Sequence, residues 1–375
     1  MELGYSDKLN TFNKRAYATP NLINVAQCDP PRYGFRPDPA IFEFLSGTDY
    51  EKGYPDASLD LVSGIVQRTK EFTGISVKDD DVIISNGLGG AFAFLSIALA
   101  GKSMGLQTPF YGPLYEYMRK TSDIWYARCT PELEWAIDCD MLRQELEKRK
   151  KPGYIVLVSP SNPTGDVHSR KSIQEIVNLA GEFDQIIITD EVYDEMSFVP
   201  YTSILSHSRD IPVIYMHGFS KVWRAPEIRI GFTILHDPEG NAHADFQEIR
   251  RIAKLGFGVN LHSQRLAALL LKEDRTYRKE QFNEIERRSK YLTDLVENSD
   301  NLQTVAAKGA TYQYVRIPGN DWKTAYRLLE RDSILTTPGS AFDPFIGDNY
   351  LRIVFLNTPE CLEKFVSSLD KLEES

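Results

Sequence analysis

The 375-residue sequence has little cysteine and histidine, and neither is spaced as in metal-binding or disulfide-rich domains. The four cysteines (28, 129, 139 and 361) form no CxxC pair, and the six histidines form no HExxH motif. These absences argue against a metal site, a zinc ribbon and a disulfide scaffold. Because free thiols persist in reducing compartments, the sequence favours a cytoplasmic protein.

Long apolar runs and an excess of positive charge are also missing. The best apolar run, Ala91–Ala100, ends at Gly101 and falls short of the roughly 18 residues that a membrane helix needs. The opening residues, MELGYSDKLN, lack the basic-then-apolar layout of a signal peptide, which again favours the cytoplasm. The net charge of −10 argues against nucleic acid or an anionic membrane as partner, since both require a positive field.

The sequence does contain a regular alternation of short β-rich runs and helical patterns. The strand candidates are runs rich in valine and isoleucine at Val82–Ser85, Tyr154–Ser159, Gln185–Thr189, Val213–Met216 and Ile228–Leu235. Between them, Arg170–Gly181 places apolar residues at helical spacing. Alternation of strands and helices over about 200 residues predicts an α/β fold, with a mainly parallel sheet covered by helices on both faces.

The pattern changes toward both ends of the chain. From His262 to Asn298 there is no glycine or proline, which predicts one long helix or two abutting helices. From Leu302 the pattern is typical of a smaller α+β unit, with strands near Thr311–Ile317 and Tyr350–Leu356. Five prolines between residues 20 and 40 indicate an irregular N-terminal arm that crosses between domains. We expect an arm and part of a small domain at 1–40, a large domain at 41–274 and the rest of the small domain at 275–375.

Polar residues follow the predicted strands, and in open parallel sheets ligands bind outside the carboxyl ends of the strands. After the first strand comes a glycine-rich turn, Asn86-Gly87-Leu88-Gly89-Gly90, whose free N–H groups suit an anion. The groups that follow are Asn162 after the second strand, Asp190 and Tyr193 after the third, Lys221 after the fourth, and Arg229 in the fifth.

Taken singly, each of these groups has an ordinary structural explanation, such as a tight turn, a helix cap or a solvated lysine. Taken together, they suit an anionic ligand with a carbonyl group for the lysine and a ring nitrogen for the aspartate. A phosphorylated pyridine aldehyde has all of these features.

Four motifs, in this order, resemble those of the class I/II aminotransferases, which are fold-type I pyridoxal-phosphate enzymes. They are SNPTG at 161–165, DEVY at 190–193, SKVWRAPEIRIG at 220–231 and YLRIVFL at 350–356. The resemblance covers nearly the whole chain, and PRYGFRPDPAI at 31–41 and HGFSK at 217–221 are most similar to the alanine aminotransferase branch. It implies that the large domain holds pyridoxal 5′-phosphate.

The resemblance also implies roles for single residues. Lys221 would form the internal aldimine and move the proton at Cα, and Asp190 would keep the pyridine nitrogen protonated. Asn162 and Tyr193 would hydrogen-bond the phenolic oxygen of the ring. The other cofactor contacts would be Gly87, Leu88, Gly89, Ser220 and Arg229 around the phosphate, Tyr111 on the ring, and Tyr54 from the neighbouring subunit at the phosphate. Arg352 would bind the substrate's carboxylate, with Asn162 and Cys28 beside the substrate.

The implied activity is transamination between an L-amino acid of alanine, aspartate or aromatic type and a 2-oxo acid, with 2-oxoglutarate or pyruvate as acceptor. The implied assembly is a homodimer with shared active sites. The same lysine, aspartate and tyrosine also serve C–S lyases, decarboxylases and amino-acid oxidases, because the pocket selects which bond breaks. An inactive binding module is a third possibility, which the presence of all the catalytic residues disfavours. Gly218 replaces a serine that is frequent in relatives, whereas Glu227 and Cys28 stand where glycine is usual.

Overall fold

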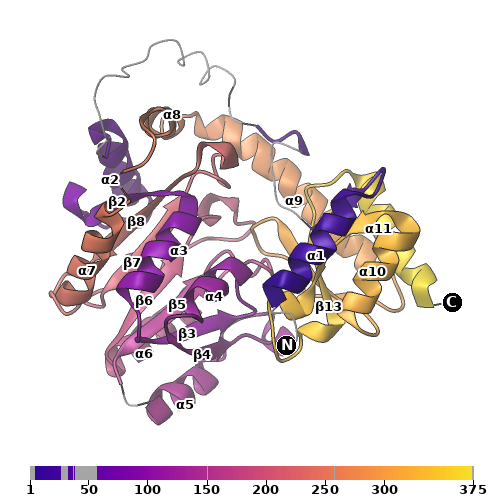
Figure 1. The fold of residues 1–375 in the computed structure, drawn as a ribbon, viewed down its shortest axis with the longest axis horizontal. Coiled ribbons are helices and arrows are strands. Elements are labelled where there is room, and N and C mark those ends of the chain that lie inside the picture. Colours follow the sequence, from indigo (N-terminus) through magenta and orange to yellow (C-terminus); the bar gives the residue numbers. More distant parts are fainter. Residues whose placement is uncertain are drawn as a thin grey trace.

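A seven-stranded mixed sheet forms the centre of the chain, in the order β2-β8-β7-β6-β5-β3-β4 (Figure 1). The computed structural model describes residues 5–26, 33–36, 38, 57–149, 151–256 and 258–373. In spatial order the strands are β2 (Val82–Asn86), β8 (Ile230–His236), β7 (Val213–Gly218), β6 (Gln185–Asp190), β5 (Gly153–Val158), β3 (Ser103–Thr108) and β4 (Asp123–Arg128). All neighbours pair in parallel except β8, which is antiparallel to both β2 and β7. The predicted α/β fold with a mainly parallel sheet is confirmed.

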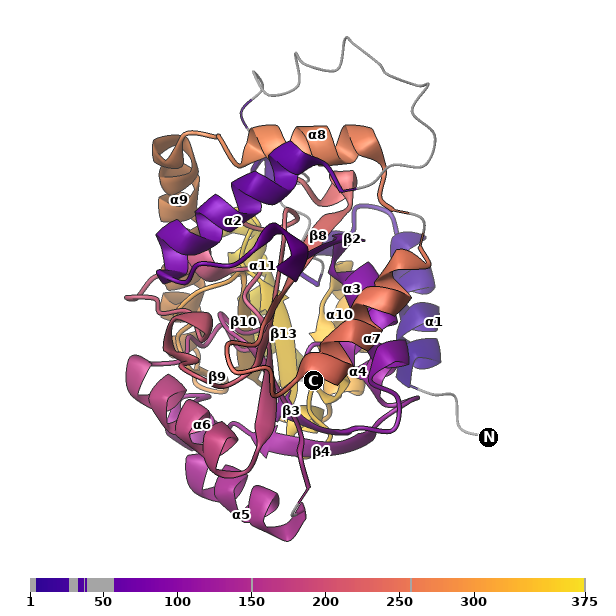
Figure 2. The same cartoon turned by 90° about the vertical axis from the view of Figure 1, so that its left-hand side faces the viewer.

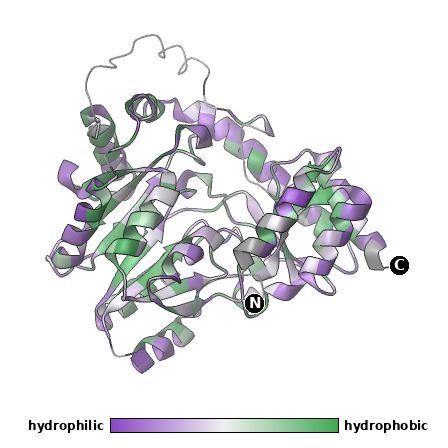
Figure 3. Cartoon of the chain, viewed as in Figure 1, coloured by the Kyte–Doolittle hydropathy of each residue, from purple (hydrophilic) through white to green (hydrophobic). Residues whose placement is uncertain are grey.

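Helices cover both faces of this sheet. On one face, in front in Figure 1, lie α3 (Gly87–Ala98), α4 (Gly112–Met118) and α7 (His243–Lys254). On the other lie α2 (Leu59–Thr73), α5 (Cys139–Arg149), α6 (Arg170–Glu182) and α8 (Leu261–Leu270). The central strands β5, β6 and β7 are apolar on both sides because each side is buried under helices, and Figure 3 shows hydrophobic residues gathered on the sheet. In the described parts of the chain, no helix is both long and apolar enough to cross a membrane.

A second, four-stranded antiparallel sheet, in the order β12-β13-β10-β9, lies to the right of the first in Figure 1 and behind it in Figure 2. Its strands are β12 (Thr337–Pro338), β13 (Tyr350–Val354), β10 (Tyr312–Arg316) and β9 (Gln303–Thr304). The helices of this part are α9 (Arg275–Glu297), α10 (Asp321–Asp332) and α11 (Pro359–Glu373). These elements make up the smaller α+β part of the chain.

The N-terminal segment packs with this C-terminal part. The ring of Phe12, on α1 (Tyr5–Tyr17), lies 5.8 Å from that of Trp322 and 4.7 Å from that of Tyr326, between centroids. Farther along, β1 (Ile23–Asn24) pairs in parallel with β11 (Ile334–Leu335). The predicted domain boundaries, at residues 40 and 274, stay a prediction.

The structure decides between one and two helices after His262, and it corrects the start of the strand expected at Ile228. The stretch from His262 to Asn298 forms two helices, α8 and α9, which are separated by residues 271–274, and the side chain of Asp274 caps the second. The strand expected from Ile228 begins only at Ile230, because Pro226–Ile228 form a 3₁₀ helix. Arg229 follows this helix with a left-handed φ of 55°. Its predicted place within the strand was therefore wrong, since proline favours a turn over a central strand.

Candidate active site

The carboxyl ends of β5, β6 and β7 meet at one edge of the central sheet, where three predicted site residues lie. Asp190 ends β6, Lys221 lies just beyond β7, and Asn162 lies in the turn after β5. Asp190 and Asn162 are each 3% exposed. Lys221 is half-buried, with its Nζ 5.7 Å from the centroid of the Tyr193 ring. The sheet thus brings together the amine, the carboxyl, the amide and the phenol that the strand ends predicted.

Asp190 sits in an environment that disfavours its charge. Burial raises its pKa to about 7, although the Val192 amide and the charge of Lys221 both act to lower it. The Val192 N–H donates to Asp190 Oδ1 at 3.1 Å. A buried carboxylate is stabilised by an adjacent cation. Asp190 is therefore suited to pair with a positively charged group of a ligand.

The turn from β2 into α3 forms a candidate anion site. Leu88 and Gly89 lie in the first turn of α3, where backbone N–H groups have no partner within the helix. Gly87 has a φ of +63°, and a Cβ there would lie 2.3 Å from Nη2 of Arg229. The guanidinium thus lies against this turn, and only glycine leaves it room. A helix N-terminus beside an arginine favours a phosphate or a carboxylate.

The end of β7, at Gly218, lies beside the same turn. A Cβ on Gly218 would lie 3.2 Å from the carbonyl oxygen of Ile230 and 3.7 Å from Leu88 Cγ. This close packing gives a physical reason for glycine in place of the serine of many relatives. Ser220 is half-buried in the loop that follows β7, and Glu227 is exposed ahead of β8.

Arg352 reaches this edge from the small sheet. It lies on β13, and its Nη1 donates to Asn162 Oδ1 at 3.0 Å, across the two sheets. Its Nη2 donates to the carbonyl of Ala26 and to Thr337 Oγ1. The guanidinium lies 4.5 Å from the centroid of the Tyr312 ring. These contacts fix a planar pair of donors of the kind that binds carboxylates.

Tyr312, on β10, is a site residue that the sequence analysis did not identify. Its hydroxyl lies 2.9 Å from that of Tyr193, and its ring stacks on Arg352. Phe342 covers the same guanidinium at 4.7 Å. Neither aromatic residue stands in a motif, so only the folded chain shows that they lie here.

Of the three remaining predicted residues, the structure describes only Tyr111. Tyr111 follows the carboxyl end of β3 and is half-buried, with the Phe92 ring 6.1 Å from its own. Tyr54 and Cys28 lie outside the described residues, so their roles stay predictions.

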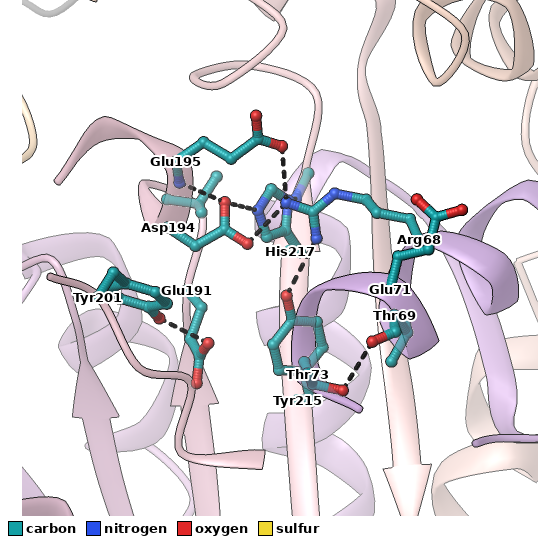
Figure 4. Close-up of polar contacts among 12 residues, drawn as sticks. Arg68, Thr69, Glu71, Thr73, Glu191, Asp194, Glu195, Tyr201, Tyr215 and His217 are labelled. Atoms are coloured by element: carbon teal, nitrogen blue, oxygen red, sulfur yellow. Dashed lines mark hydrogen bonds and ion pairs between the residues drawn. The ribbon is translucent and has the colours of Figure 1, made fainter. Parts of the chain in front are cut away.

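A buried cluster of charges includes Asp194, which follows Tyr193 in the sequence, together with Arg68 and His217 (Figure 4). Asp194 accepts a hydrogen bond from Arg68 Nη2 at 2.7 Å and lies 3.0 Å from His217 Nε2. Burial alone would raise the pKa of Asp194, but Arg68 and His217 outweigh it and hold that pKa below its usual range. Because Arg68 is on α2 and His217 on β7, the cluster fixes the turn after β6 to both elements. No motif in the sequence indicated it.

A second buried ion pair fixes the loop after Lys221. Arg224 Nη2 donates to Glu273 Oε1 at 2.6 Å, and Nη1 donates to the carbonyl of Val222 at 2.6 Å. Both side chains of the pair are fully buried. The lysine loop is therefore held to the segment between α8 and α9.

We expect Arg68→Met to lower the free energy of unfolding by about 3–5 kcal/mol, because Asp194 is left buried without its main counter-ion. Urea denaturation followed by circular dichroism measures this change. Arg119→Met is the matched control, since Arg119 pairs with Glu116 at the surface and its loss should cost under ~1 kcal/mol. Equal losses in the two variants would contradict the stabilising role of the cluster.

Comparison with known proteins decides which family the fold and the site represent. The family model for aminotransferase class I and II matches residues 50–369. The chain belongs to this family. An aspartate aminotransferase of Thermotoga maritima is 26% identical over 350 residues, which cover 90% of this chain and 87% of the relative. The glutamate-pyruvate aminotransferase AlaA of Haemophilus influenzae is 26% identical over 367 residues, covering 91% and 88%.

A solved structure gives the same result for the fold. The alanine aminotransferase from Pyrococcus furiosus matches with a TM-score of 0.89 at 27% identity, covering 97% of this chain and 94% of that chain. The predictions of a fold-type I aminotransferase and of transamination as its activity are confirmed. In the described parts of this aminotransferase, no group of three or more His, Cys, Asp or Glu side chains is arranged to hold a metal ion.

Proposed function

We propose that this aminotransferase binds pyridoxal 5′-phosphate at the carboxyl edge of the central sheet and transfers an amino group between an L-amino acid and a 2-oxo acid. The observation that carries the proposal is the meeting of Asp190 and Lys221 at adjacent strand ends, with Arg352 reaching over to Asn162. The donor is of alanine, aspartate or aromatic type, and the acceptor is 2-oxoglutarate or pyruvate. Relatives named aspartate, tyrosine and glutamate-pyruvate aminotransferases support this substrate range.

The described residues fit this cofactor. Its phosphate suits the N-terminus of α3, where Gly87 leaves room for the guanidinium of Arg229. Its ring nitrogen, when protonated, supplies a cation for the buried Asp190. The remaining contacts that we assign to it are those of Leu88, Gly89 and Ser220 with the phosphate, of Tyr111 with the ring face, and of Asn162 and Tyr193 with the phenolic oxygen. When bound, pyridoxal phosphate supplies a ring that accepts electrons from the substrate's Cα.

The residues that touch the cofactor or the substrate then have distinct roles. Lys221 would hold the cofactor through its Nζ, and its amine would move the proton at the substrate's Cα. Asp190 holds a proton on the ring nitrogen. Arg352 binds the α-carboxylate with two parallel N–H donors, which orients Cα toward the lysine. Asn162, hydrogen-bonded to this arginine, links substrate binding to the cofactor's phenolic oxygen.

The test uses the purified protein and added pyridoxal phosphate. We expect a protein-bound absorbance band, and after reduction with borohydride a modified peptide that contains Lys221. Lys308, held by Asp166 at 3.1 Å, is an internal control that should stay unmodified. Titration with single amino acids in the absence of oxo acid then identifies donors by the spectral change that each produces. Absence of the band, or modification at another lysine, contradicts the proposal.

We also propose that the protein works as a cytoplasmic homodimer with shared active sites, in which Tyr54 of one copy reaches the phosphate bound to the other. The family resemblance supports the dimer. The free thiols of Cys129, Cys139 and Cys361 support a reducing compartment. Sedimentation equilibrium should give twice the mass of the chain, and a monomer that is fully active would contradict this proposal.

We expect Asp190→Asn to make the cofactor-free protein less sensitive to rising pH. Burial raises the pKa of Asp190 to about 7, whereas an aspartate in an unfolded chain has a pKa of about 3.9. Between these values the folded protein holds a proton that the unfolded chain has lost, so stability falls as the pH rises. Across this window the difference in unfolding free energy between wild type and variant should change by about 4 kcal/mol. Urea denaturation at several pH values measures it.

Glu191→Gln is the matched control for this prediction. Burial raises the pKa of Glu191 to about 7 as well, and Tyr201 donates to its Oε2 at 2.6 Å. Without cofactor the two variants should behave alike. Added pyridoxal phosphate should abolish the effect of Asp190→Asn on the pH dependence of stability, because a cationic ring nitrogen lowers the pKa of Asp190. It should leave the effect of Glu191→Gln unchanged. Persistence of both effects in the loaded protein would contradict the pairing of Asp190 with the ring.

A further inference from the structure

Tyr193 and Tyr312 meet where the two sheets face each other. Their hydroxyl oxygens lie 2.9 Å apart, and their rings pack edge to face with centroids 5.9 Å apart. Each side chain is 3% exposed. Tyr193 comes from the turn after β6 of the central sheet, and Tyr312 from β10 of the small sheet. The hydrogen bond is therefore sheltered from water and joins the two parts of the chain.

The direction of this hydrogen bond follows from the number of protons available. A tyrosine hydroxyl donates one proton and can accept two hydrogen bonds. In the proposed function Tyr193 donates its proton to the cofactor's phenolic oxygen, which is a stronger acceptor when ionised than a neutral hydroxyl is. Tyr312 is then the donor within the tyrosine pair. Its donation polarises the Tyr193 O–H bond and makes Tyr193 a better donor in turn.

We propose that Tyr312 is a positioning residue that acts through Tyr193 to set the protonation of the bound cofactor. This inference rests on the proposed function. Donation by Tyr193 stabilises negative charge on the phenolic oxygen, and this charge is least neutralised when the nitrogen that joins Lys221 to the cofactor has lost its proton. Tyr312 therefore lowers the pKa of that nitrogen and enlarges its unprotonated fraction at neutral pH.

Among the described residues, the charged groups that face the pair are Lys221, 5.7 Å from the Tyr193 ring, and Arg352, 4.5 Å from the Tyr312 ring, and Asp190 precedes the turn at the end of β6. Tyr312→Phe leaves all three charges in place. It also keeps the ring beneath the guanidinium of Arg352. The substitution thus removes the donating hydroxyl and nothing else that faces the site.

The experiment is a pH titration of the absorbance of the protein loaded with pyridoxal phosphate. We expect Tyr312→Phe to raise the pKa of the bound cofactor by a few tenths of a unit, and Tyr193→Phe to raise it further. The double variant should match Tyr193→Phe alone, since the hydroxyl of Tyr312 then has no O–H bond to polarise. Tyr314→Phe is the control, because Tyr314 lies on the same face of β10 but donates to the Gly339 carbonyl at 2.8 Å. It should produce no shift.

The outcomes separate this inference from the proposed function. Additive shifts in the double variant would overturn the inference, as would a Tyr312→Phe titration identical to the wild type while Tyr193→Phe shifts. A shift in Tyr314→Phe as large as that in Tyr312→Phe would assign the effect to a general loosening of β10 and overturn it too. Failure of the wild type to bind the cofactor, or of Tyr193→Phe to shift its pKa, instead contradicts the proposed function.

Discussion

Lys221→Ala lowers kcat by a factor of about 10³ to 10⁴, the loss expected when a positioned proton-transfer group is removed. The variant also loses the covalent link to the cofactor, so borohydride reduction should no longer give a modified peptide at this position. The fold should persist, because Lys221 is half-buried and lies in a loop that Arg224 and Glu273 hold independently. Steady-state kinetics with an amino acid donor, together with circular dichroism, measures both expectations.

Lys102→Ala is the matched control for this prediction. Lys102 precedes β3 at the opposite edge of the same sheet, where its Nζ pairs with Asp245 at 2.8 Å. Removal of an amine there should leave kcat within about two-fold of the wild type, since this partly exposed pair contributes little to stability. A comparable loss in both variants would trace the effect of Lys221→Ala to unfolding, and near-normal turnover in Lys221→Ala would remove the lysine from the mechanism.

The part of the site that the sequence predicts is the part governed by strand ends. An apolar run that ends in, or leads into, polar residues identifies both a buried strand and the polar group at its carboxyl end. Such runs occur at Val82–Asn86, Gln185–Asp190 and Val213–Gly218. The strand ends therefore predict the positions of Asp190 and Lys221 without any knowledge of their contacts. In contrast, β3 and β4 carry polar residues such as Gln107 and Asp123 and do not read as apolar runs.

The rest of the site depends on contacts between residues that are far apart in the sequence. Tyr312 lies 119 positions from Tyr193, and Asp194 lies 126 positions from Arg68, so no local spacing reveals either pair. Strand direction is equally hidden, because an antiparallel strand such as β8 has the same apolar pattern as its parallel neighbours. The sequence therefore identifies the elements that carry the strand-end groups, but it does not show how the elements are oriented relative to one another.

Arg352→Ala should lower kcat/KM by about 10² to 10³ for every amino acid donor, mainly by raising KM. The reason is that the substrate's carboxylate is left in a buried site without its charged partner, and such a loss typically costs about 2–5 kcal/mol. Arg352→Lys keeps the charge but loses the planar pair of donors, so it should recover only part of the loss. Steady-state kinetics over several donors separates KM from kcat.

A control variant and a measurement of cofactor binding test whether Arg352 acts on the substrate alone. Arg316→Ala removes an arginine from β10 of the same small sheet, where the guanidinium is exposed and pairs with Gln303 at 3.2 Å, and it should leave KM unchanged. Arg352→Ala should still bind pyridoxal phosphate, because the phosphate, ring-nitrogen and lysine contacts that we assign within one copy all lie on the central sheet and its loops. If the variant lost the absorbance of the bound cofactor, Arg352 would belong to the cofactor's own binding site, and the bond from its Nη1 to Asn162 would be the contact responsible.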